Sequence, residues 1–424
     1  ALALLGADDL APGDHEVLKR LAAVKEAPPL LFHYDAAALD EATVAAAVER
    51  NLGFFRTLEK EMRMRYEGRI HLFLYRDGAH LKEVTGSDAA AFSRGRRSVH
   101  QPHDYDDPHE MVHIFALQIP NGAESVPPDG FFVEGLATAL QKEDNAIAID
   151  DYAVAYLRAG RIPRLVELRR SWPQGAAPGV HPYHVAGSFL SFLISELGIE
   201  KTKTLYTNCL ECQGIAGRSF ARLERDWWDW LDRREPRAGA EETVLKRLGV
   251  TERIPKALAD AKASALFDGR SLHGWNLEHP QSWKARLGAI AGETSEPWHR
   301  IHARERRSGD VAARVRLRLV AGDAVQVRLN RDDTQANEAI FAAWETFLVR
   351  EGPGGGLLAR SPYRILPGRW IEVVFVNQDG RGRVYVDGLL MLDAVGLCTA
   401  EGSVGISVER GVAEIREVSL LQLR

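Results

Sequence analysis

The hydrophobic pattern of this chain changes its period near Arg234, and this change divides the 424 residues into two kinds of structure. After about Leu266, apolar and polar residues alternate, most strictly from Val311 to Val320. Because successive side chains of a strand point to opposite faces, this pattern predicts half-buried strands. Many such strands, separated by turns such as Asp379-Gly380, predict a β-sandwich or jelly roll.

The residues before Arg234 have mostly helical periodicity. Apolar residues from Asp40 to about Tyr66 recur every three or four positions, which predicts a long amphipathic helix. Strands are expected at 29–34 and 69–75, so this half is α+β. The polar stretch from Arg234 to Gly239 contains Pro and Gly, which favours a domain boundary. We therefore predict a multidomain chain, with a first domain at residues 1–235, a linker with short helices at 236–262 and an all-β domain at 263–424.

One motif, His109-Glu110-Met111-Val112-His113, predicts chemistry. Residues i and i+4 of a helix share a face, so both imidazoles can reach one metal ion, with Glu110 beside them. Asp107-Pro108 favours a helix start, with Asp107 as N-cap and Pro108 at the first helical position. A hydrolytic Zn²⁺ site keeps one position open and so needs a third protein ligand. Glu110 is then the expected general base, which takes a proton from the attacking water.

A second segment, Phe131-Phe-Val-Glu134-Gly-Leu-Ala, places a glutamate 21 positions after His113. With it, the first domain resembles the gluzincins of the MA clan, in particular the bacterial peptidase-MA-like group, whose second helix reads aromatic-x-x-Glu-Gly-x-Ala. The resemblance covers roughly the first 235 residues. It implies a thermolysin-like metallopeptidase fold, zinc ligands His109, His113 and Glu134, and a peptide or protein substrate.

The segment Tyr183-His184-Val-Ala-Gly is similar to a later helix of the same family. Gluzincins stabilise the tetrahedral oxyanion with a Tyr or His from a helix beyond the third ligand. The resemblance therefore implies Tyr183 as the first candidate for this role, with His184 and His181 behind it. We interpret the other histidines near these segments as ordinary surface or packed side chains, namely His71, His80, His100 and His103.

The second domain opens with Leu266-Phe-Asp-Gly-Arg-Ser-Leu-His-Gly-Trp275, which resembles the 3-keto-disaccharide hydrolase-like family. That family is a concanavalin-A-like jelly roll, and the strands from Trp370 onward also fit it. The resemblance implies sugar binding or docking. The Asn-Ser-Gly segment of the family has no clear counterpart here and no clear carboxylate pair occurs, so we do not expect glycosidic catalysis. Three tryptophans are candidates for stacking on a sugar, with core packing as the alternative: Trp298, Trp344 and Trp370.

Composition excludes some functions and leaves others open. A net charge of −5 gives no drive toward nucleic acid or anionic lipid, and no apolar run is long enough to span a bilayer. Cys209 and Cys212 have C-x-x-C spacing, which fits a small disulfide or two thiols, with a redox or metal role as the alternative. The first residues, Ala1 to Ala7, fit the remainder of a removed secretion signal or an artificial start.

These observations favour a secreted, periplasmic or cell-surface zinc metallopeptidase, whose jelly roll holds it near a carbohydrate-bearing target. The first alternative is a carbohydrate-binding or carbohydrate-active protein in which the gluzincin domain is a scaffold. The second is a zinc-binding pseudoenzyme that serves as an interaction module.

Overall fold

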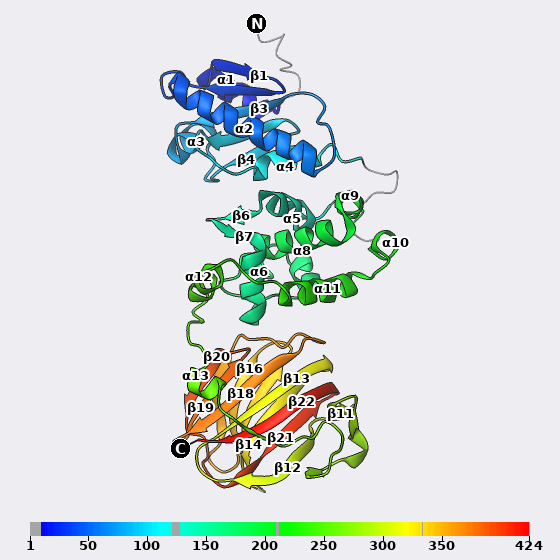
Figure 1. Ribbon diagram of the computed structural model, residues 1–424. Coiled ribbons are helices and arrows are strands. Elements are labelled where there is room, and N and C mark those ends of the chain that lie inside the picture. The colour runs from blue at the N-terminus through cyan, green and yellow to red at the C-terminus, as the bar shows by residue number, and fades with distance from the viewer. Residues whose placement is uncertain (1–9, 121–127, 209–211, 333, 424) are drawn as a thin grey trace. The chain divides into compact units, whose positions relative to one another are not determined.

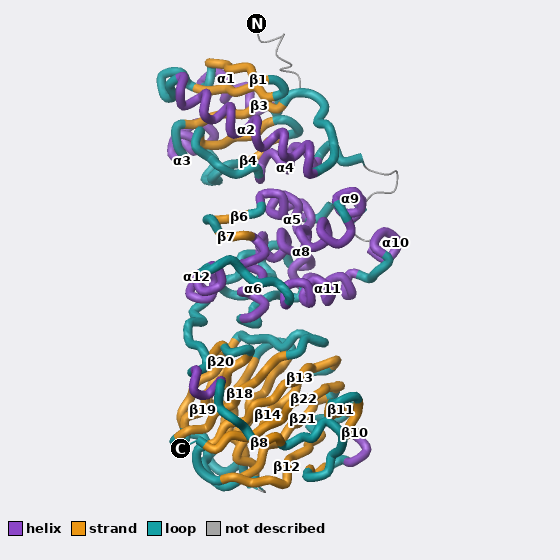
Figure 2. Tube along the Cα trace, in the orientation of Figure 1, coloured by secondary structure: helices purple, strands orange, loops and turns teal. Residues whose placement is uncertain are grey.

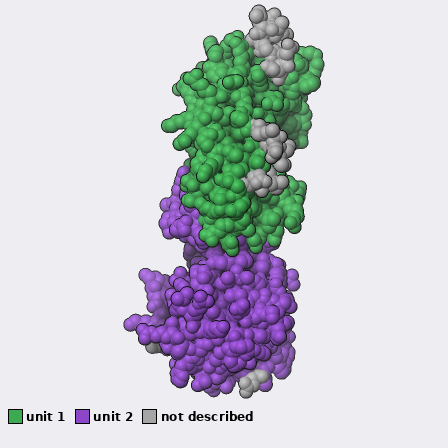
Figure 3. All heavy atoms as spheres, turned by 90° about the vertical axis from the view of Figure 1, so that its right-hand side faces the viewer, with its two compact units in different colours: residues 1–150, 164–176, 181–227 green, residues 151–163, 177–180, 228–424 purple. Residues whose placement is uncertain are grey.

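The computed structural model describes residues 10–120, 128–208, 212–332 and 334–423. Its segments form two compact units. Unit 1 comprises residues 1–150, 164–176 and 181–227, and unit 2 comprises 151–163, 177–180 and 228–424 (Figure 3). Each unit combines several separate ranges of the chain, so the division does not test the predicted domain boundaries at 235 and 263, which stay a prediction. Within the described ranges, no helix has the length and apolar character needed to cross a membrane.

Unit 1 begins with a five-stranded mixed sheet (Figure 1). Its strand order is β1-β2-β3-β5-β4, and β3 pairs in parallel with both β2 and β5. The strands are β1 (Ala23–Ala27), β2 (Leu30–Tyr34), β3 (Ile70–Tyr75), β4 (Phe92–Arg94) and β5 (Ser98–Pro102). The helices of this region are α1 (Pro12–Arg20), α2 (Glu41–Glu61) and α3 (Gly78–Thr85). The helix and both strands expected before residue 76 are therefore present.

Helix α2 begins where the side chain of Asp40 accepts a hydrogen bond from the Thr43 amide at 2.8 Å, which caps its N-terminus. Its apolar stripe, including Val44 and Leu58, is buried. Phe55 lies on this stripe, and its ring centroid is 5.1 Å from that of Phe115. This contact joins α2 to the helix that carries the predicted metal ligands.

Three buried histidines lie on neighbouring strands of this sheet. His33, His71 and His100 are each at most 2% exposed. His33 Nε2 lies 2.9 Å from His71 Nδ1, and His100 Nε2 lies 3.1 Å from Asp14 Oδ1. The Phe73 ring stacks on both His33 and His100. Burial, and then the neighbouring His71, lower the pKa of His33 to about 3.

We predict that the folded chain loses stability as the pH falls from about 6.5 toward 3. In this window His33 binds a proton in the unfolded chain, where its pKa is ordinary, but not in the folded chain. Such a group removes up to about 1.4 kcal/mol of unfolding free energy per pH unit, and above the window its contribution is constant. Urea unfolding at about pH 7.5, 6 and 5 measures this slope.

In the His33→Gln variant, the unfolding free energy should depend less steeply on pH, by the contribution of about one proton. His15 is exposed on α1, so His15→Gln is the matched control and should keep the wild-type slope. Equal slopes for His33→Gln and the wild type would show that His33 titrates alike in both states.

The rest of unit 1 is mostly helical (Figure 2). Its elements are α4 (His109–Ala116), α5 (Gly130–Gln141), β6 (Glu143–Asp144), β7 (Ile147–Ala148), α7 (Leu165–Arg170), α8 (Pro182–Leu197), α9 (Ile199–Thr207) and α10 (Cys212–Ala216). Two helices, α6 (Ile149–Arg158) and α11 (Phe220–Asp232), begin in unit 1 and end in unit 2. The short helices α12 (Ala240–Arg247) and α13 (Lys256–Ala259) belong to unit 2.

Helices α5 and α8 pack closely because each has a glycine at the contact. A Cβ atom at Gly135 would lie 2.9 Å from Leu190 Cδ2 and 3.1 Å from the Ala186 carbonyl oxygen. A Cβ atom at Gly187 would lie 2.6 Å from Thr138 Cγ2. A larger residue at either position would require a neighbouring side chain or backbone atom to shift. Gly135 follows Glu134 directly, so the close packing also fixes the helix turn that carries this glutamate.

Unit 2 is built on a β-sandwich of two antiparallel sheets (Figure 1). The first sheet contains β8 (Ser264–Ala265), β10 (Trp283–Arg286), β11 (Ala289–Thr294), β22 (Gly411–Gln422), β13 (Val311–Ala321), β18 (Ile371–Gln378), β19 (Arg381–Val386) and β20 (Leu389–Val395). The second, seven-stranded sheet contains β17 (Gly356–Ser361), β16 (Thr346–Glu351), β15 (Ala336–Ala342), β14 (Ala324–Arg331), β21 (Gly402–Glu409), β12 (His299–Arg307) and β9 (Trp275–Leu277). The predicted all-β sandwich is therefore present.

The sandwich core consists of the apolar residues of the alternating strands, such as Val315 and Leu317 of β13 and Val327 of β14. Helical segments of unit 2 pack against this sandwich. Arg369 donates hydrogen bonds to the Asp232 carboxylate at the end of α11, at 2.9 to 3.1 Å. Arg364 donates its amide hydrogen to the Gly160 carbonyl at 3.0 Å.

Candidate metal centre

The predicted metal-binding helix α4 begins at His109, one residue later than the sequence pattern suggests. Pro108 is the N-cap residue and has helical backbone angles, so it is not at the first helical position. Asp107 still caps the turn, because its Oδ1 accepts a hydrogen bond from the His109 amide at 2.8 Å. This hydrogen bond fixes how the chain enters the first turn of α4. The face of α4 that carries His109 and His113 is directed toward α5.

His109, His113 and Glu134 come together between α4 and α5. Their ligand atoms all lie within 4.8 Å of one another. Glu134 Oε2 lies 3.1 Å from His109 Nε2 and 3.4 Å from His113 Nε2. Three ligands of a tetrahedral zinc ion, each at about 2.1 Å, are about 3.4 Å apart from one another. The three residues therefore fit a zinc ion without a large rearrangement, and they are the only such group among the described residues.

The electrostatics of this group are those of a partly buried ion pair. Burial raises the pKa of Glu134, but hydrogen bonds from His109 and His113 outweigh it and lower that pKa to about 2. Burial lowers the pKa of His109, and the hydrogen bond to Glu134 and the charge of Glu110 outweigh it, so the net shift is upward. Glu134 is thus an anion at neutral pH, which is the form that binds a metal ion.

Gln141 is a further residue of this site that we did not predict. Its Oε1 accepts a hydrogen bond from His109 Nδ1 at 3.1 Å, and its Nε2 donates to the Glu143 carbonyl at 2.9 Å. The second bond fixes which end of the amide faces His109. In the protonated ring Nε2 donates to Glu134, and when the ring is neutral its proton is held on Nδ1, so that the lone pair of Nε2 is free to bind a metal ion. Gln141 lies seven residues after Glu134, on the same face of α5, which is the signal that could have identified it.

We predict that the Gln141→Leu variant binds zinc about 10- to 100-fold more weakly. The substitution keeps the side-chain size but removes the acceptor, so the His109 ring can turn and present a protonated nitrogen. Competition with a chromophoric chelator measures the affinity. Gln118→Leu is the matched control, since the Gln118 side chain forms hydrogen bonds with the backbone of Glu67. Equal affinities for the two variants would show that Gln141 does not position His109.

The predicted general base Glu110 is partly exposed and is not a member of the ligand group. It lies close enough to act electrostatically on two residues of the site. Its charge favours protonated His109 and contributes to the raised pKa of Tyr183. The role of Glu110 as general base stays a prediction.

Of the three oxyanion candidates, Tyr183 is the one whose ring contacts a predicted metal ligand among the described residues. Its ring centroid is 6.2 Å from that of His109, and burial, then Glu134 and Glu110, raise its pKa. His184 is buried and its Nε2 lies 3.0 Å from Asp144 Oδ2 in the β6–β7 hairpin. The His181 ring lies 4.9 Å from the His184 ring. His184 thus contacts Asp144, and the Tyr183 ring lies near both His109 and His181, with its centroid 5.2 Å from that of His181.

Two other sequence features have different outcomes. Cys212 is buried, but Cys209 lies outside the described residues, so the predicted C-x-x-C pair is not tested.

Among the candidate tryptophans, Trp344 is 52% exposed. The Trp370 ring is covered by guanidinium groups, with those of Arg318 and Arg416 at 4.8 and 4.5 Å from its centroid. Trp344 is therefore more accessible to a ligand than Trp370.

No protein-family model matches this chain, and no curated protein matches it. Among solved structures, the carbohydrate binding module CBM66 from Bacillus subtilis is 17% identical, covers 35% of this chain and 96% of its own, and has a TM-score of 0.33. The β-glucanase of Bacillus licheniformis is 11% identical over 39% of this chain and 100% of its own, with a TM-score of 0.32. The exoplasmic/lumenal domain of VIP36, in its Ca²⁺- and Man3GlcNAc-bound form, is 14% identical over 39% and 91%, with a TM-score of 0.33. The gluzincin resemblance has no support from these comparisons.

Proposed function

We propose that this chain is a zinc-dependent hydrolase of peptide bonds, with His109, His113 and Glu134 as the metal ligands. The observation that supports the proposal is the spacing of the three ligand atoms, at 3.1 and 3.4 Å from the shared Glu134 oxygen. Two histidines and a glutamate are a ligand set of hydrolytic zinc sites that keep a position open. A zinc ion bound there supplies Lewis-acid chemistry and makes a water molecule acidic near neutral pH.

The protein side chains supply the remaining steps of the proposed reaction. Glu110 accepts the proton of the attacking water and passes it to the leaving amine. The raised pKa of Tyr183 keeps its hydroxyl protonated at neutral pH, so the hydroxyl can donate a hydrogen bond to the oxyanion. Gln141 holds His109 in the tautomer that binds metal. The substrate is a peptide or protein outside the cytoplasm, in a secreted, periplasmic or cell-surface setting.

A peptide-library digest of the full chain tests this proposal. We expect cleavage that stops when zinc is removed by a chelator and returns when zinc is added back. Bound zinc without any cleavage would favour the zinc-binding pseudoenzyme. Cleavage that continues after the metal has been removed would contradict the proposal.

Carbohydrate binding by unit 2 is the second candidate function. The observation that favours it is the outer face of the seven-stranded sheet, the face turned away from the sandwich core. Polar side chains there, including Gln326, Arg328 and Ser407, are almost fully buried rather than solvated. Buried polar groups need hydrogen-bond partners, and a sugar carries many hydroxyl groups that can both donate and accept.

A further inference from the structure

Three polar side chains of unit 2 follow one another within hydrogen-bonding distance. Ser282 Oγ lies 2.7 Å from His299 Nδ1, and His299 Nε2 lies 3.5 Å from Glu296 Oε2. Ser282 ends a short 3₁₀ turn (Pro280–Ser282), Glu296 lies between β11 and β12, and His299 is the first residue of β12. A hydroxyl group, an imidazole and a carboxylate in this order are the arrangement that activates a serine as a nucleophile.

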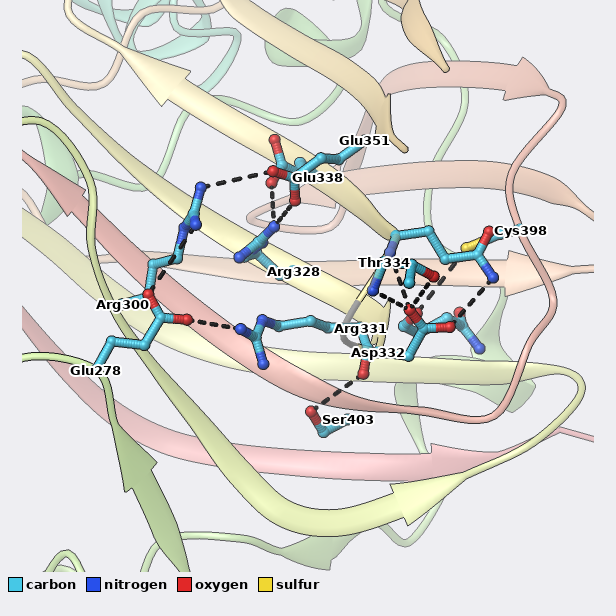
Figure 4. Close-up of polar contacts among 12 residues, drawn as sticks. Glu278, Arg300, Arg328, Arg331, Asp332, Thr334, Glu338, Glu351, Cys398 and Ser403 are labelled. Carbon is cyan, nitrogen blue, oxygen red and sulfur yellow. Dashed lines mark hydrogen bonds and ion pairs between the residues drawn. The ribbon is translucent and has the colours of Figure 1, made fainter. Parts of the chain in front are cut away.

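The imidazole in the middle of this series is almost fully buried. His299 is 8% exposed, and its ring stacks on that of His279, with the centroids 3.9 Å apart and the planes at 14°. It lies on the same side of β12 as Ile301, which belongs to the sandwich core. Arg300, between them, points to the outer face of the sheet and contacts Glu278 at 4.0 Å (Figure 4). The His299 ring therefore belongs to the inner side of the sheet, away from the polar outer face.

The turn that carries Glu296 is fixed through its backbone. Thr294 Oγ1 accepts a hydrogen bond from the Glu296 amide at 2.9 Å and donates one to the Glu296 carbonyl at 3.2 Å. The Arg410 amide donates to the same carbonyl at 3.1 Å. The carboxylate itself is 73% exposed, and its contact with His299 is long. Contacts of this kind shorten in many active sites when the substrate is bound.

The three groups have complementary roles toward the proton. A carboxylate only accepts hydrogen bonds, so the neutral His299 ring donates its one N–H from Nε2 to Glu296. The lone pair of Nδ1 then faces Ser282 and accepts the hydrogen bond of its hydroxyl group. His299 is thus placed to take the Ser282 proton when the oxygen attacks, and the charge of Glu296 stabilises the imidazolium that forms.

A pocket of about 470 Å³ lies beside these groups, and this volume is in the range of small-molecule sites. Ser282, His299 and Glu296 all line it, together with a second carboxylate, that of Glu293. Among the described residues that line the pocket, none is a lysine or an arginine. Two carboxylates without a cation beside them disfavour an anionic substrate. The pocket therefore fits a small neutral or cationic molecule.

The exposure of Glu296 favours an ester over a peptide bond as the substrate. Water screens the charge of an exposed carboxylate, so this carboxylate stabilises an imidazolium less than a buried one does. An alcohol is a better leaving group than an amine, so the cleavage of an ester needs less of this stabilisation.

We propose that Ser282, His299 and Glu296 form a hydrolytic site, separate from the zinc ligands, that cleaves small carboxylic esters of neutral or cationic alcohols. Ser282 Oγ bonds to the acyl carbon while its proton moves to His299 Nδ1. The bond from this carbon to the alcohol oxygen then breaks, and the alcohol leaves with that proton. Water next loses a proton to His299 and its oxygen bonds to the acyl carbon. Ser282 takes this proton back as the carboxylic acid is released.

Labelling of the full chain with a fluorophosphonate tests for the nucleophile, because this probe phosphonylates an activated serine and releases fluoride. We expect the mass of the probe on the peptide that contains Ser282. Labelling should be at least about 100-fold slower in His299→Gln, which lacks the base. His273→Gln is the matched control, since His273 is exposed in unit 2 outside the pocket, and it should be labelled at the wild-type rate.

Hydrolysis of p-nitrophenyl acetate tests turnover, and a chelator present throughout separates it from the zinc site. We expect hydrolysis that continues with the chelator and is at least about 100-fold slower in Ser282→Ala and in His299→Gln. Ser308→Ala is the matched control for the serine, because Ser308 is exposed in the turn after β12. It should keep the wild-type rate.

Three results would overturn the proposal. The first is a wild-type chain without the probe on Ser282, a result that does not depend on whether any variant folds. The second is unchanged labelling in His299→Gln, which would show that the bond between Ser282 and His299 is only structural. The third is ester hydrolysis that stops with the chelator and is unchanged in Ser282→Ala, which would assign this activity to the zinc site.

Discussion

Glu110→Gln is expected to keep its zinc and to lose about 10²- to 10⁴-fold in peptide hydrolysis. Glu110 is not one of the three grouped ligands, so we expect that replacing its carboxylate by an amide removes only the proton acceptor. The amide has nearly the same size, and we expect the fold and the ligand spacing to be unchanged. Turnover of a fluorogenic peptide, measured beside the zinc content of the same sample, checks both parts of the expectation.

The control for this variant is Glu49→Gln, the same chemical change at an exposed position of α2. It should hydrolyse the peptide at the wild-type rate. Wild-type activity in Glu110→Gln would show that Glu110 is not the base. Loss of zinc together with activity would show that Glu110 supports the ligands instead of acting on the water.

Glu134→Gln has the second large expected effect, which is loss of the metal itself. The carboxylate contacts both histidines and supplies the only negative charge of the ligand group. A neutral amide in its place is a much poorer zinc ligand. We expect zinc affinity to fall by more than the about 10- to 100-fold of a residue that only orients a ligand. Hydrolysis should be absent at zinc concentrations that saturate the wild type.

Chelator competition on Glu134→Gln, Gln141→Leu and the wild type gives the order of the three affinities. The expected order is wild type, then Gln141→Leu, then Glu134→Gln. Wild-type affinity in Glu134→Gln would remove this glutamate from the ligand set. Circular dichroism of each variant shows whether lost affinity reflects a lost fold.

The sequence was sufficient to predict that His109 and His113 lie together, because their pattern is local, whereas Glu134 came from the resemblance to the gluzincins and metal binding stays a prediction. The i, i+4 spacing places His109 and His113 on one face of α4, and helix geometry alone decides this. The β-sandwich was equally readable, since strands such as β13 alternate strictly between apolar and charged residues. Both predictions depend only on how side-chain direction repeats along a helix or a strand, and this repeat can be read from a single segment.

The parts that could not be predicted depend on contacts between distant segments. Gln141 reaches His109 through the packing of α5 against α4, and Gly135 and Gly187 let α5 and α8 pack closely. The division into units is another case, since α6 and α11 both cross between them. The helical periodicity of α11 does not reveal that Asp232, at its end, accepts hydrogen bonds from Arg369, which lies 137 residues later in the sequence.

The polar outer face of the seven-stranded sheet was also hidden in the sequence. Alternation identifies Gln326 and Arg328 as residues that point away from the core, which normally means solvated residues. Their burial arises from the strand register, which places Ser407, Glu338 and Arg300 around them. Register between strands far apart in sequence is set by the whole sandwich, so a single strand does not reveal it.

X-ray absorption at the zinc edge, on the full chain purified with zinc and then freed of excess metal, tests the central claim most directly. The account predicts about one zinc per chain, with nitrogen and oxygen ligands at about 2.0–2.2 Å and the multiple scattering of two imidazoles. His113→Ala should lose this signal. A chain that retains no zinc would contradict the account, and so would zinc surrounded by sulfur at about 2.3 Å, which would place the metal at Cys209 and Cys212 instead.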